Sequence, residues 1–431
     1  MPIAAWAVIG RGSRGTGLGR IVGERTAGNA EGATVRDGPA SGVCDDLLPY
    51  ADGDVADTLA RLVEDKDLLQ FLAGYRLPRL NRMFPSLTQR LVQHRLRGQI
   101  AGVSDIEGFQ NVMSHYARRL VQDTMTFMRY EGVDALPEGP CLFVGNHRDI
   151  AADSMCLNYA LYYSGRSTVR IAVGDNLIQR SFATDLMRLN KSFFIQRNVP
   201  GAKRQYAALL GSSRFIHESL DAGESVWIAQ SEGRAKDGVD VTDPAIIKMF
   251  TLADRRAELG ALLRRLRVVP VSIAYEYDPC DVLKARELTL REAEGDYEKP
   301  AGEDLRSLAL GLAGHKGRVV LRVGSPLVDD FESPEAVALE IDRQILGLYQ
   351  LFPVNYLALE VLSGIAGAEA FADAQHTVSE AGHFQPTAET RAAFAARIDG
   401  CPPEYRRRWL ESYANPIVNK LRCGVGTLAP I

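Results

Sequence analysis

The sequence of 431 residues lacks the signals of several protein classes. It has no run of about 18 uncharged apolar residues, which a membrane-spanning helix would need. The nearest candidate, PVNYLALEVLSGIAGAEAFA, is interrupted by Glu360 and Glu369. The N-terminus has no apolar core of a signal peptide, and the net charge of −4 is not that of a dedicated nucleic-acid binder. We therefore expect a soluble or peripheral protein.

Cysteine motifs and a serine nucleophile motif are also missing. The six cysteines are widely spaced, form no CxxC pair and share no zinc-ligand spacing with histidines. This pattern favours reduced thiols in a cytosolic protein and predicts no metal site. No GxSxG elbow exists, so an acyl-enzyme on serine is unsupported.

Residues 1–45 are rich in Gly, Ala, Arg and Thr, and we expect them to be a disordered leader, whose presence in the mature protein stays open. Gly10, Gly12 and Gly15 fit the GxGxxG fingerprint of dinucleotide binding. However, more glycines follow where a helix should begin, and no second strand with an acidic end is evident. An NAD-dependent dehydrogenase is thus a minor alternative.

Residues 46–135 predict a helical domain, with apolar residues at three- and four-residue spacing over 54–75 and 105–130. Asp105 is a candidate cap for the second helix. Between these segments, six arginines without an acidic residue alternate with Leu, Met, Phe and Val: Arg76, Arg79, Arg82, Arg90, Arg95 and Arg97. Such a basic amphipathic surface can lie on anionic lipid. The alternative is a helix that packs on its own domain, with arginine stems reaching water.

The pattern changes to alternating strands and helices over residues 136–335. Six segments predict strands: PCLFVGN, VRIAVGDN, KSFFIQR, SVWIAQSEG, RVVPVSIAYEY and RVVLRVGSPL. The fold class is therefore α/β, with a mostly parallel central sheet flanked by helices. Residues 336–431 predict a C-terminal helical region.

Chemically active side chains follow four of these strands. Asn146, His147, Asp149 and Asp153 follow the first, and Arg197 follows KSFFI. Glu232, Gly233 and Arg234 follow the fourth, and Pro270 lies in the fifth. Taken singly, each is more often structural than catalytic. In an open sheet, however, ligands gather beyond the carboxyl ends of the strands, so the set predicts a site.

The four blocks NHRDIAAD, FFIQR, SEGRAKDG and VVPVSI resemble those of the glycerolipid acyltransferase family, over roughly residues 136–330. That family has a His and an Asp separated by four residues, whereas five separate His147 from Asp153 here. Asp149 is the second choice for the carboxylate. The third block also lacks the residue usual between Gly and Arg, and Ser231 stands where the family often has Pro.

The resemblance implies transfer of an acyl chain from an acyl thioester, either acyl-CoA or acyl-carrier-protein, to glycerol 3-phosphate or 1-acylglycerol 3-phosphate. Both thioesters are co-substrates, so no cofactor is expected. Neutral imidazole suits the general base, with Asp153 fixing its tautomer. The resemblance implies that Arg197 and Arg234 bind the acceptor phosphate.

Six further residues complete the predicted substrate site. Arg148 and Lys236 are additional phosphate candidates, and Asn146 is a further substrate-binding candidate. Glu232 would orient an arginine or the glycerol hydroxyls, Gly233 would let backbone approach the ligand, and Pro270 would shape a pocket. We expect a place on the cytoplasmic membrane face. A non-catalytic lipid-surface protein with a degenerate acyltransferase fold remains an alternative.

Overall fold

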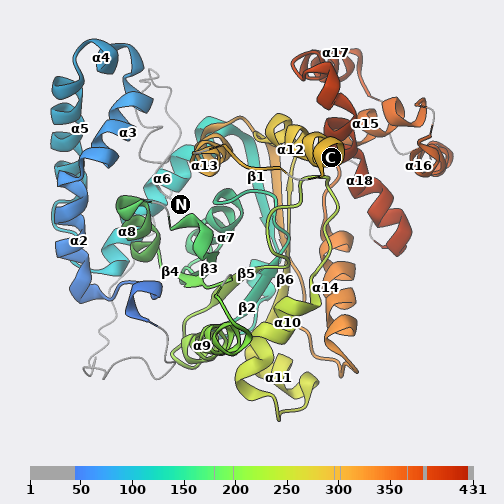
Figure 1. The fold of residues 1–431 in the computed structure, drawn as a ribbon. Coiled ribbons are helices and arrows are strands. Elements are labelled where there is room, and N and C mark those ends of the chain that lie inside the picture. Colours follow the sequence, from blue (N-terminus) through green and yellow to red (C-terminus); the bar gives the residue numbers. More distant parts are fainter. Residues whose placement is uncertain are drawn as a thin grey trace.

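The computed structural model describes residues 44–178, 180–197, 199–295, 297–300, 302–365, 367–381 and 386–425. The expected leader and its GxGxxG glycines lie almost entirely outside these residues. All six predicted strands are present: β2 (Leu142–Gly145), β3 (Arg170–Gly174), β4 (Ser192–Ile195), β5 (Val226–Ala229), β6 (Val268–Tyr275) and β7 (Gly317–Val323). They belong to one seven-stranded sheet with the order β1-β7-β6-β2-β5-β3-β4 (Figure 1).

The seventh strand corrects a predicted helix. Helix α6 (Ile106–Thr124) does not continue to residue 130, because Met125–Glu131 forms β1 at the edge of the sheet. β1 pairs in parallel with β7, and the N–H of Lys316 donates to the carbonyl of Thr124 exactly where the helix stops (2.8 Å). Pairing with a distant strand thus overrides a local helical pattern.

The strands that carry the predicted motifs all point the same way. β6, β2, β5, β3 and β4 are parallel to one another, and β7 is antiparallel to β6. The mostly parallel sheet predicted from the sequence is confirmed. The residues that follow β2, β4 and β5 therefore emerge at one edge of the sheet.

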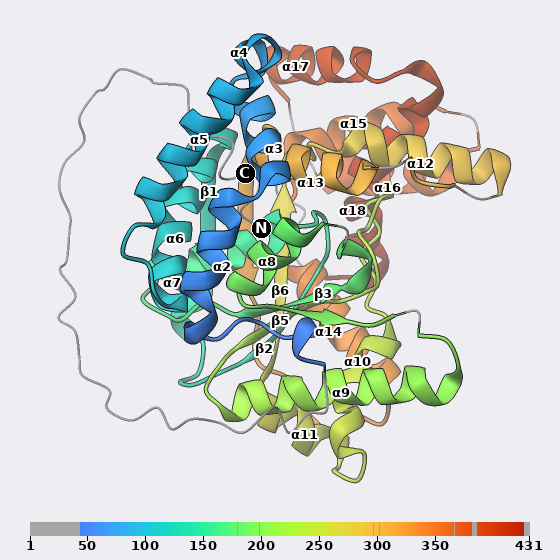
Figure 2. The ribbon, with the colours of Figure 1, turned by 60° about the vertical axis from the view of Figure 1, so that its left-hand side comes forward.

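Helices cover both faces of the sheet. One face packs against α6, α7 (Ala152–Tyr163) and α8 (Ser181–Leu189). The other packs against α9 (Ala202–Asp221), α10 (Pro244–Thr251), α11 (Leu259–Leu266) and α14 (Pro334–Leu348). Figures 1 and 2 show α9, α10 and α11 grouped on one side of the strands.

The crossovers from neighbouring strands β2 and β5 leave on opposite faces. β2 continues into α7 on one face, and β5 continues into α10 on the other. Such a topological switch point opens a crevice between the two strand ends, where ligands bind in open α/β sheets. The loops after β2 and β5 hold the first and third sequence blocks.

The N-terminal helices form a layer beside this core: α2 (Asp52–Glu64), α3 (Lys66–Arg76), α4 (Pro78–Met83) and α5 (Pro85–Ile100) (Figure 1). The predicted segment 54–75 is split because Asp65 ends α2 and caps α3 by accepting from the N–H of Leu68 (2.8 Å). Asp105 caps α6 as predicted, accepting from the N–H of Gly108 (2.7 Å).

The C-terminal helices form a third hydrophobic core together with residues of β6 and β7: α15 (Pro353–Ser363), α16 (Glu369–Ala381), α17 (Ala388–Asp399) and α18 (Arg406–Cys423). They contact α12 (Asp281–Glu294), which follows β6, whereas α13 (Glu303–Ala313) contacts α6. Short 3-10 turns occupy Asp45–Leu47, Val133–Ala135, Asp175–Leu177, Leu252–Asp254 and Pro403–Tyr405. Within the described ranges no single helix has the length and apolar composition to cross a membrane; α14 and α15 together meet that test but are bent by 103°.

Candidate active site

The loop after β2 begins with a structural residue. Asn146 is fully buried, and its side-chain amide exchanges two hydrogen bonds with the backbone of Ile273 in β6, at 3.0 Å and 2.8 Å. The amide thus extends the strand pairing by one step beyond Gly145. This corrects the assignment of Asn146 to substrate binding, because its polar atoms are already used inside the sheet.

The next residue forms an imidazole–carboxylate pair with Asp153. Nδ1 of His147 lies 2.9 Å from Oδ2 of Asp153. A carboxylate only accepts, so Nδ1 carries the hydrogen and Nε2 is left as the free base. The ring is mostly shielded, with 16% of the side chain exposed, and packs edge-on against Trp227. Of the two aspartates that the sequence left open, the structure places Asp153 beside the histidine.

Asp153 is held by more than the histidine. Its Oδ2 also accepts from the N–H groups of Arg148 (2.8 Å) and Asp149 (2.9 Å), and its Oδ1 accepts from the hydroxyl of Tyr275 (2.9 Å). The five residues between His147 and Asp153 therefore form a loop that closes over the Asp153 carboxylate. Tyr275, the last residue of β6, was not found from the sequence because it lies 122 positions away.

Asp149 has a different function in the loop. Its Oδ1 accepts from the N–H groups of Ala151 (3.0 Å) and Ala152 (2.8 Å), so it caps the start of α7. This arrangement explains why Asp149 does not pair with His147.

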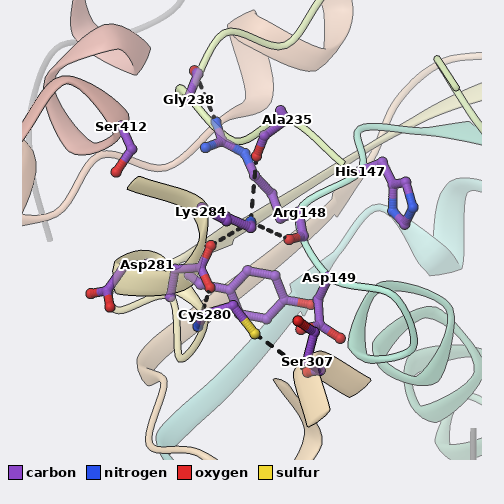
Figure 3. A network of polar contacts seen from close by, with 12 residues as sticks. His147, Arg148, Asp149, Ala235, Gly238, Cys280, Asp281, Lys284, Ser307 and Ser412 are labelled. Atoms are coloured by element: carbon purple, nitrogen blue, oxygen red, sulfur yellow. Dashed lines mark hydrogen bonds and ion pairs between the residues drawn. The ribbon is translucent and has the colours of Figure 1, made fainter. Parts of the chain in front are cut away.

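Arg148 points away from His147 (Figure 3). Its guanidinium pairs with Asp240, donates to the carbonyl of Gly238 (3.2 Å) and lies over the ring of Tyr349. Burial lowers its pKa, but the Asp240 carboxylate, together with Tyr349 and Asp278, holds the pKa above its usual value. The prediction that Arg148 binds phosphate is therefore wrong: it is a buried structural cation.

A cleft of about 700 Å³ opens at the carboxyl edge of the sheet and includes the imidazole. Its lining combines apolar residues with cationic and polar ones. The lining residues are His147, Ile150, Ile171, Ala172, Val173, Gly174, Asn176, Leu177, Arg197, Trp227, Ala229, Gly233, Arg234, Lys236, Lys299 and Asp304. Clefts that combine apolar walls with a few convergent polar groups bind small ligands.

Arg197 reaches the cleft from the end of β4. Its guanidinium lies against the backbone of Gly174, where a Cβ atom would come within 2.8 Å of the guanidinium carbon. Its Nη1 donates to Oε1 of Glu232 (3.2 Å), whose side chain is 65% exposed. Glu232 thus orients an arginine, which is one of the two roles predicted for it. Gly233 follows with φ of +80°, a conformation that favours glycine.

Two more cations come from the loop after β5. Arg234 lines the cleft, and its buried Nη1 has no hydrogen-bond partner within the described part of the chain. Lys236 also lines the cleft and pairs with Glu287 of α12 (3.0 Å). Burial lowers the pKa of Lys236, and Glu287 opposes that shift. Four of the predicted binding residues, Arg197, Gly233, Arg234 and Lys236, thus line one cleft with His147.

Two charged residues of the lining were not predicted from the sequence. Lys299 and Asp304 belong to the segment around the start of α13, and Nζ of Lys299 donates to Oδ1 of Asp304 (2.7 Å). They follow no predicted strand, so no sequence signal connected them with the site.

Pro270 lies elsewhere than predicted. It is the third residue of β6, pairs with Val144 in the middle of the sheet and is buried. It is absent from the lining of the cleft, so its assignment to a substrate pocket is corrected to a structural position in the strand.

Among the described residues no group of three or more His, Cys, Asp or Glu side chains is arranged to hold a metal. All six cysteines fall within the described ranges and are free thiols, four of them buried. Burial raises the pKa of the Cys156 thiol to about 12, which disfavours the thiolate form that a nucleophile needs.

Comparison with known proteins matches this part of the chain to a family. The model of the family described as Acyltransferase matches residues 127–274, from β1 to near the end of β6. Residues 127–274 are thus similar to the Acyltransferase family. The match begins in β1, before the roughly 136–330 span of the sequence resemblance, and ends at residue 274.

One curated relative is a glycerol-3-phosphate acyltransferase of Hamiltonella defensa subsp. Acyrthosiphon pisum (strain 5AT), 26% identical over 235 residues. The alignment covers 54% of this chain, and the chain spans about a quarter of the relative's length (26%). Among solved structures, the 1-acyl-sn-glycerophosphate acyltransferase PlsC of Thermotoga maritima has a TM-score of 0.31 and 16% identity, covering 67% of this chain and 91% of PlsC.

Proposed function

We propose that this acyltransferase domain esterifies glycerol 3-phosphate or 1-acylglycerol 3-phosphate with an acyl chain from a thioester, in phospholipid biosynthesis. One observation carries the proposal: His147, whose Nδ1 lies 2.9 Å from Oδ2 of the buried Asp153, lines the same cleft as Arg197 and Arg234. A base that can take a hydroxyl proton thus lies beside cations that suit a phosphate.

In the proposed reaction, the acceptor hydroxyl attacks the thioester carbonyl carbon. Nε2 of His147 takes the hydroxyl proton as the C–O bond forms, and Asp153 stabilises the resulting imidazolium. The C–S bond then breaks, and the imidazolium returns the proton to the leaving thiolate. The products are an ester and a free thiol. No acyl-enzyme is needed.

The lining of the cleft offers groups that suit both the phosphate and the acyl chain of the substrates. The guanidinium groups of Arg197 and Arg234 would hold the acceptor phosphate, and Lys236 adds a third positive charge nearby. Ile150, Leu177 and Trp227 lie on the apolar part of the lining, which suits an acyl chain. The thioester of CoA or of acyl-carrier-protein is a co-substrate, and this chemistry requires no cofactor.

An acceptor panel with one labelled acyl donor tests the proposal. We expect acyl transfer to glycerol 3-phosphate or 1-acylglycerol 3-phosphate, and at least about 100-fold less to glycerol, since the loss of charge-assisted bonds to two arginines removes about 3 kcal/mol or more. The assay uses acyl-CoA and acyl-carrier-protein in parallel arms. Vesicle binding without turnover on any acceptor would instead favour the non-catalytic lipid-surface protein.

We also propose that the α4–α5 surface holds the enzyme on an anionic membrane. Met83, Phe84, Leu87 and Leu91 are exposed, by 69%, 52%, 52% and 51%. Leu87 and Leu91 lie one turn apart on α5, after the N-cap Phe84, and outside the buried stripe of Thr88, Val92 and Leu96. Arg79, Arg82, Arg90 and Arg95 have no ion-pair partner among the described carboxylates, whereas Arg97 pairs with Glu64. Apolar side chains flanked by unpaired arginines suit an anionic lipid surface.

Replacing Phe84 and Leu87 together with glutamate should lower binding to phosphatidylglycerol vesicles by at least about 10-fold, because it removes apolar insertion and adds like charge. Vesicle sedimentation measures this. The matched control replaces Val328 and Leu339, exposed by 59% and 70% elsewhere on the protein, with glutamate and should bind normally. Equal loss in both double variants would contradict a specific lipid surface.

A further inference from the structure

We propose that Lys284 is a positioning residue, which fixes the distance between the loop of the general base and the loop of the phosphate-binding cations. This inference deepens the proposed acyltransferase function and rests on it. Lys284 lies in α12, outside all four sequence blocks. It touches neither the imidazole nor the cleft lining, so it would act through the backbone.

The ammonium group of Lys284 joins the two loops directly. Nζ donates to the carbonyl of Arg148 (2.6 Å), to the carbonyl of Ala235 (3.4 Å) and to the carboxylate of Asp278 (Figure 3). The side chain is only 4% exposed. Arg148 directly follows His147, and Ala235 directly follows Arg234. One buried cation therefore binds the peptide beside the base and the peptide beside a predicted phosphate ligand.

A direct bond between the loops completes the connection. The N–H of Ala235 donates to the carbonyl of His147 (2.8 Å). The N–H of Ala235 is thus bound to the base loop, and its carbonyl is bound to Lys284. If the ammonium were removed, the Ala235 peptide would keep one of these two contacts, and the base loop would lose its contact at Arg148.

The C-terminal helices hold the outer part of the same loop. The side-chain amide of Asn415 in α18 donates to the carbonyl of Asp237 (2.7 Å), and the guanidinium of Arg148 donates to the carbonyl of Gly238 (3.2 Å). The hydroxyl of Tyr413 in α18 accepts from the N–H of Asp278 (3.0 Å). Asp278 is the residue whose carboxylate pairs with Lys284. The loop after β5 is therefore fixed at its outer end by α18, and Lys284 sets its inner end.

The charge of Lys284 matters as well as its reach. Asp278 is partly buried, with 22% of its side chain exposed. Burial raises the pKa of its carboxyl, but the ammonium of Lys284, together with the N–H of Cys280 and the charge of Arg234, holds that pKa below its usual value. The carboxylate and the ammonium thus depend on one another. A neutral side chain at position 284 would leave a partly buried charge and two carbonyls without this donor.

The test compares Lys284→Met with Lys284→Arg. Because a displacement of about 1 Å in a catalytic constellation can cost about 100-fold, we expect Lys284→Met to lower kcat about 10- to 100-fold and to raise KM for the phosphorylated acceptor. Lys284→Arg keeps the charge and the donors, so it should recover a large part of both. If Lys284→Met does not fold, Lys284→Arg alone tests the role. Its kcat and KM should then lie between the wild-type values and the losses expected for Lys284→Met.

The matched control is Lys191→Met. Lys191 is also a buried lysine that donates to a carbonyl (Thr168, 2.8 Å) and to a carboxylate (Glu224), but it lies before β4, at the opposite edge of the sheet. Melting temperatures are measured for both variants. Lys191→Met should keep kcat and KM within about twofold per folded molecule. Wild-type constants in Lys284→Met, or the same losses in Lys191→Met, would overturn the positioning role.

A readout without turnover separates this inference from the proposed function. Inorganic phosphate is titrated while the ring resonances of His147 are followed by NMR. The wild-type resonances should shift on phosphate binding, and Lys284→Met should need about 10-fold more phosphate for the same shift. If the wild type binds phosphate but transfers no acyl chain, the proposed function fails while this comparison still decides the role of Lys284. Equal titrations in the two proteins would count against it.

Discussion

Replacing His147 with alanine is expected to lower kcat for acyl transfer by about 10²–10⁴-fold, the usual contribution of one general base. The variant removes the free Nε2 but leaves the cationic part of the cleft, Arg197 and Arg234, in place. KM for the phosphorylated acceptor should therefore change little. Initial rates with labelled acyl donor over a range of acceptor concentrations separate the two constants.

The control for this variant is His376→Ala. His376 is 75% exposed on α16 and pairs with Glu380 one turn away, so the substitution should leave both constants unchanged. Activity of His147→Ala equal to that of the wild type would dismiss the base assignment. A loss that appears only in KM would instead assign the imidazole to acceptor binding.

The parts of the fold that the sequence predicted are those with strong local patterns. All six predicted strands are short apolar runs bounded by polar or glycine residues, and each is buried in the sheet. The convergence of His147, Arg197 and Arg234 also followed, because parallel strands bring their carboxyl ends to one edge. Only β1 was mistaken, since its pairing with β7, about 190 residues later, has no local signature.

The direction of individual side chains could not be predicted. Asn146, His147 and Arg148 are consecutive, yet one bonds inside the sheet, one lines the cleft and one is buried against Asp240. Adjacency in a loop does not fix orientation, which is set by partners such as Ile273 and Asp240 that lie far away in the sequence. For the same reason, Lys284 and Tyr275 could not be found from the sequence.

Replacing Asp153 with asparagine is expected to lower kcat by about 10²-fold or more while the loop stays folded. Oδ2 of Asp153 already accepts from two backbone N–H groups as well as from His147. An amide nitrogen would repel those donors, so the amide oxygen must take this place and the NH₂ must face the hydroxyl of Tyr275. The histidine then keeps its tautomer and loses only the negative charge that stabilises the imidazolium.

This geometry predicts a smaller loss than the roughly 10⁴-fold seen when the same change in a Ser-His-Asp triad reverses the tautomer. Steady-state kinetics on Asp153→Asn and Asp149→Asn make the comparison. Asn is as good a helix cap as Asp, so Asp149→Asn should keep the start of α7 and retain kcat within about threefold. A greater loss in Asp149→Asn than in Asp153→Asn would mean that the carboxylate assisting the imidazole in solution is Asp149, contrary to the 2.9 Å contact with Asp153.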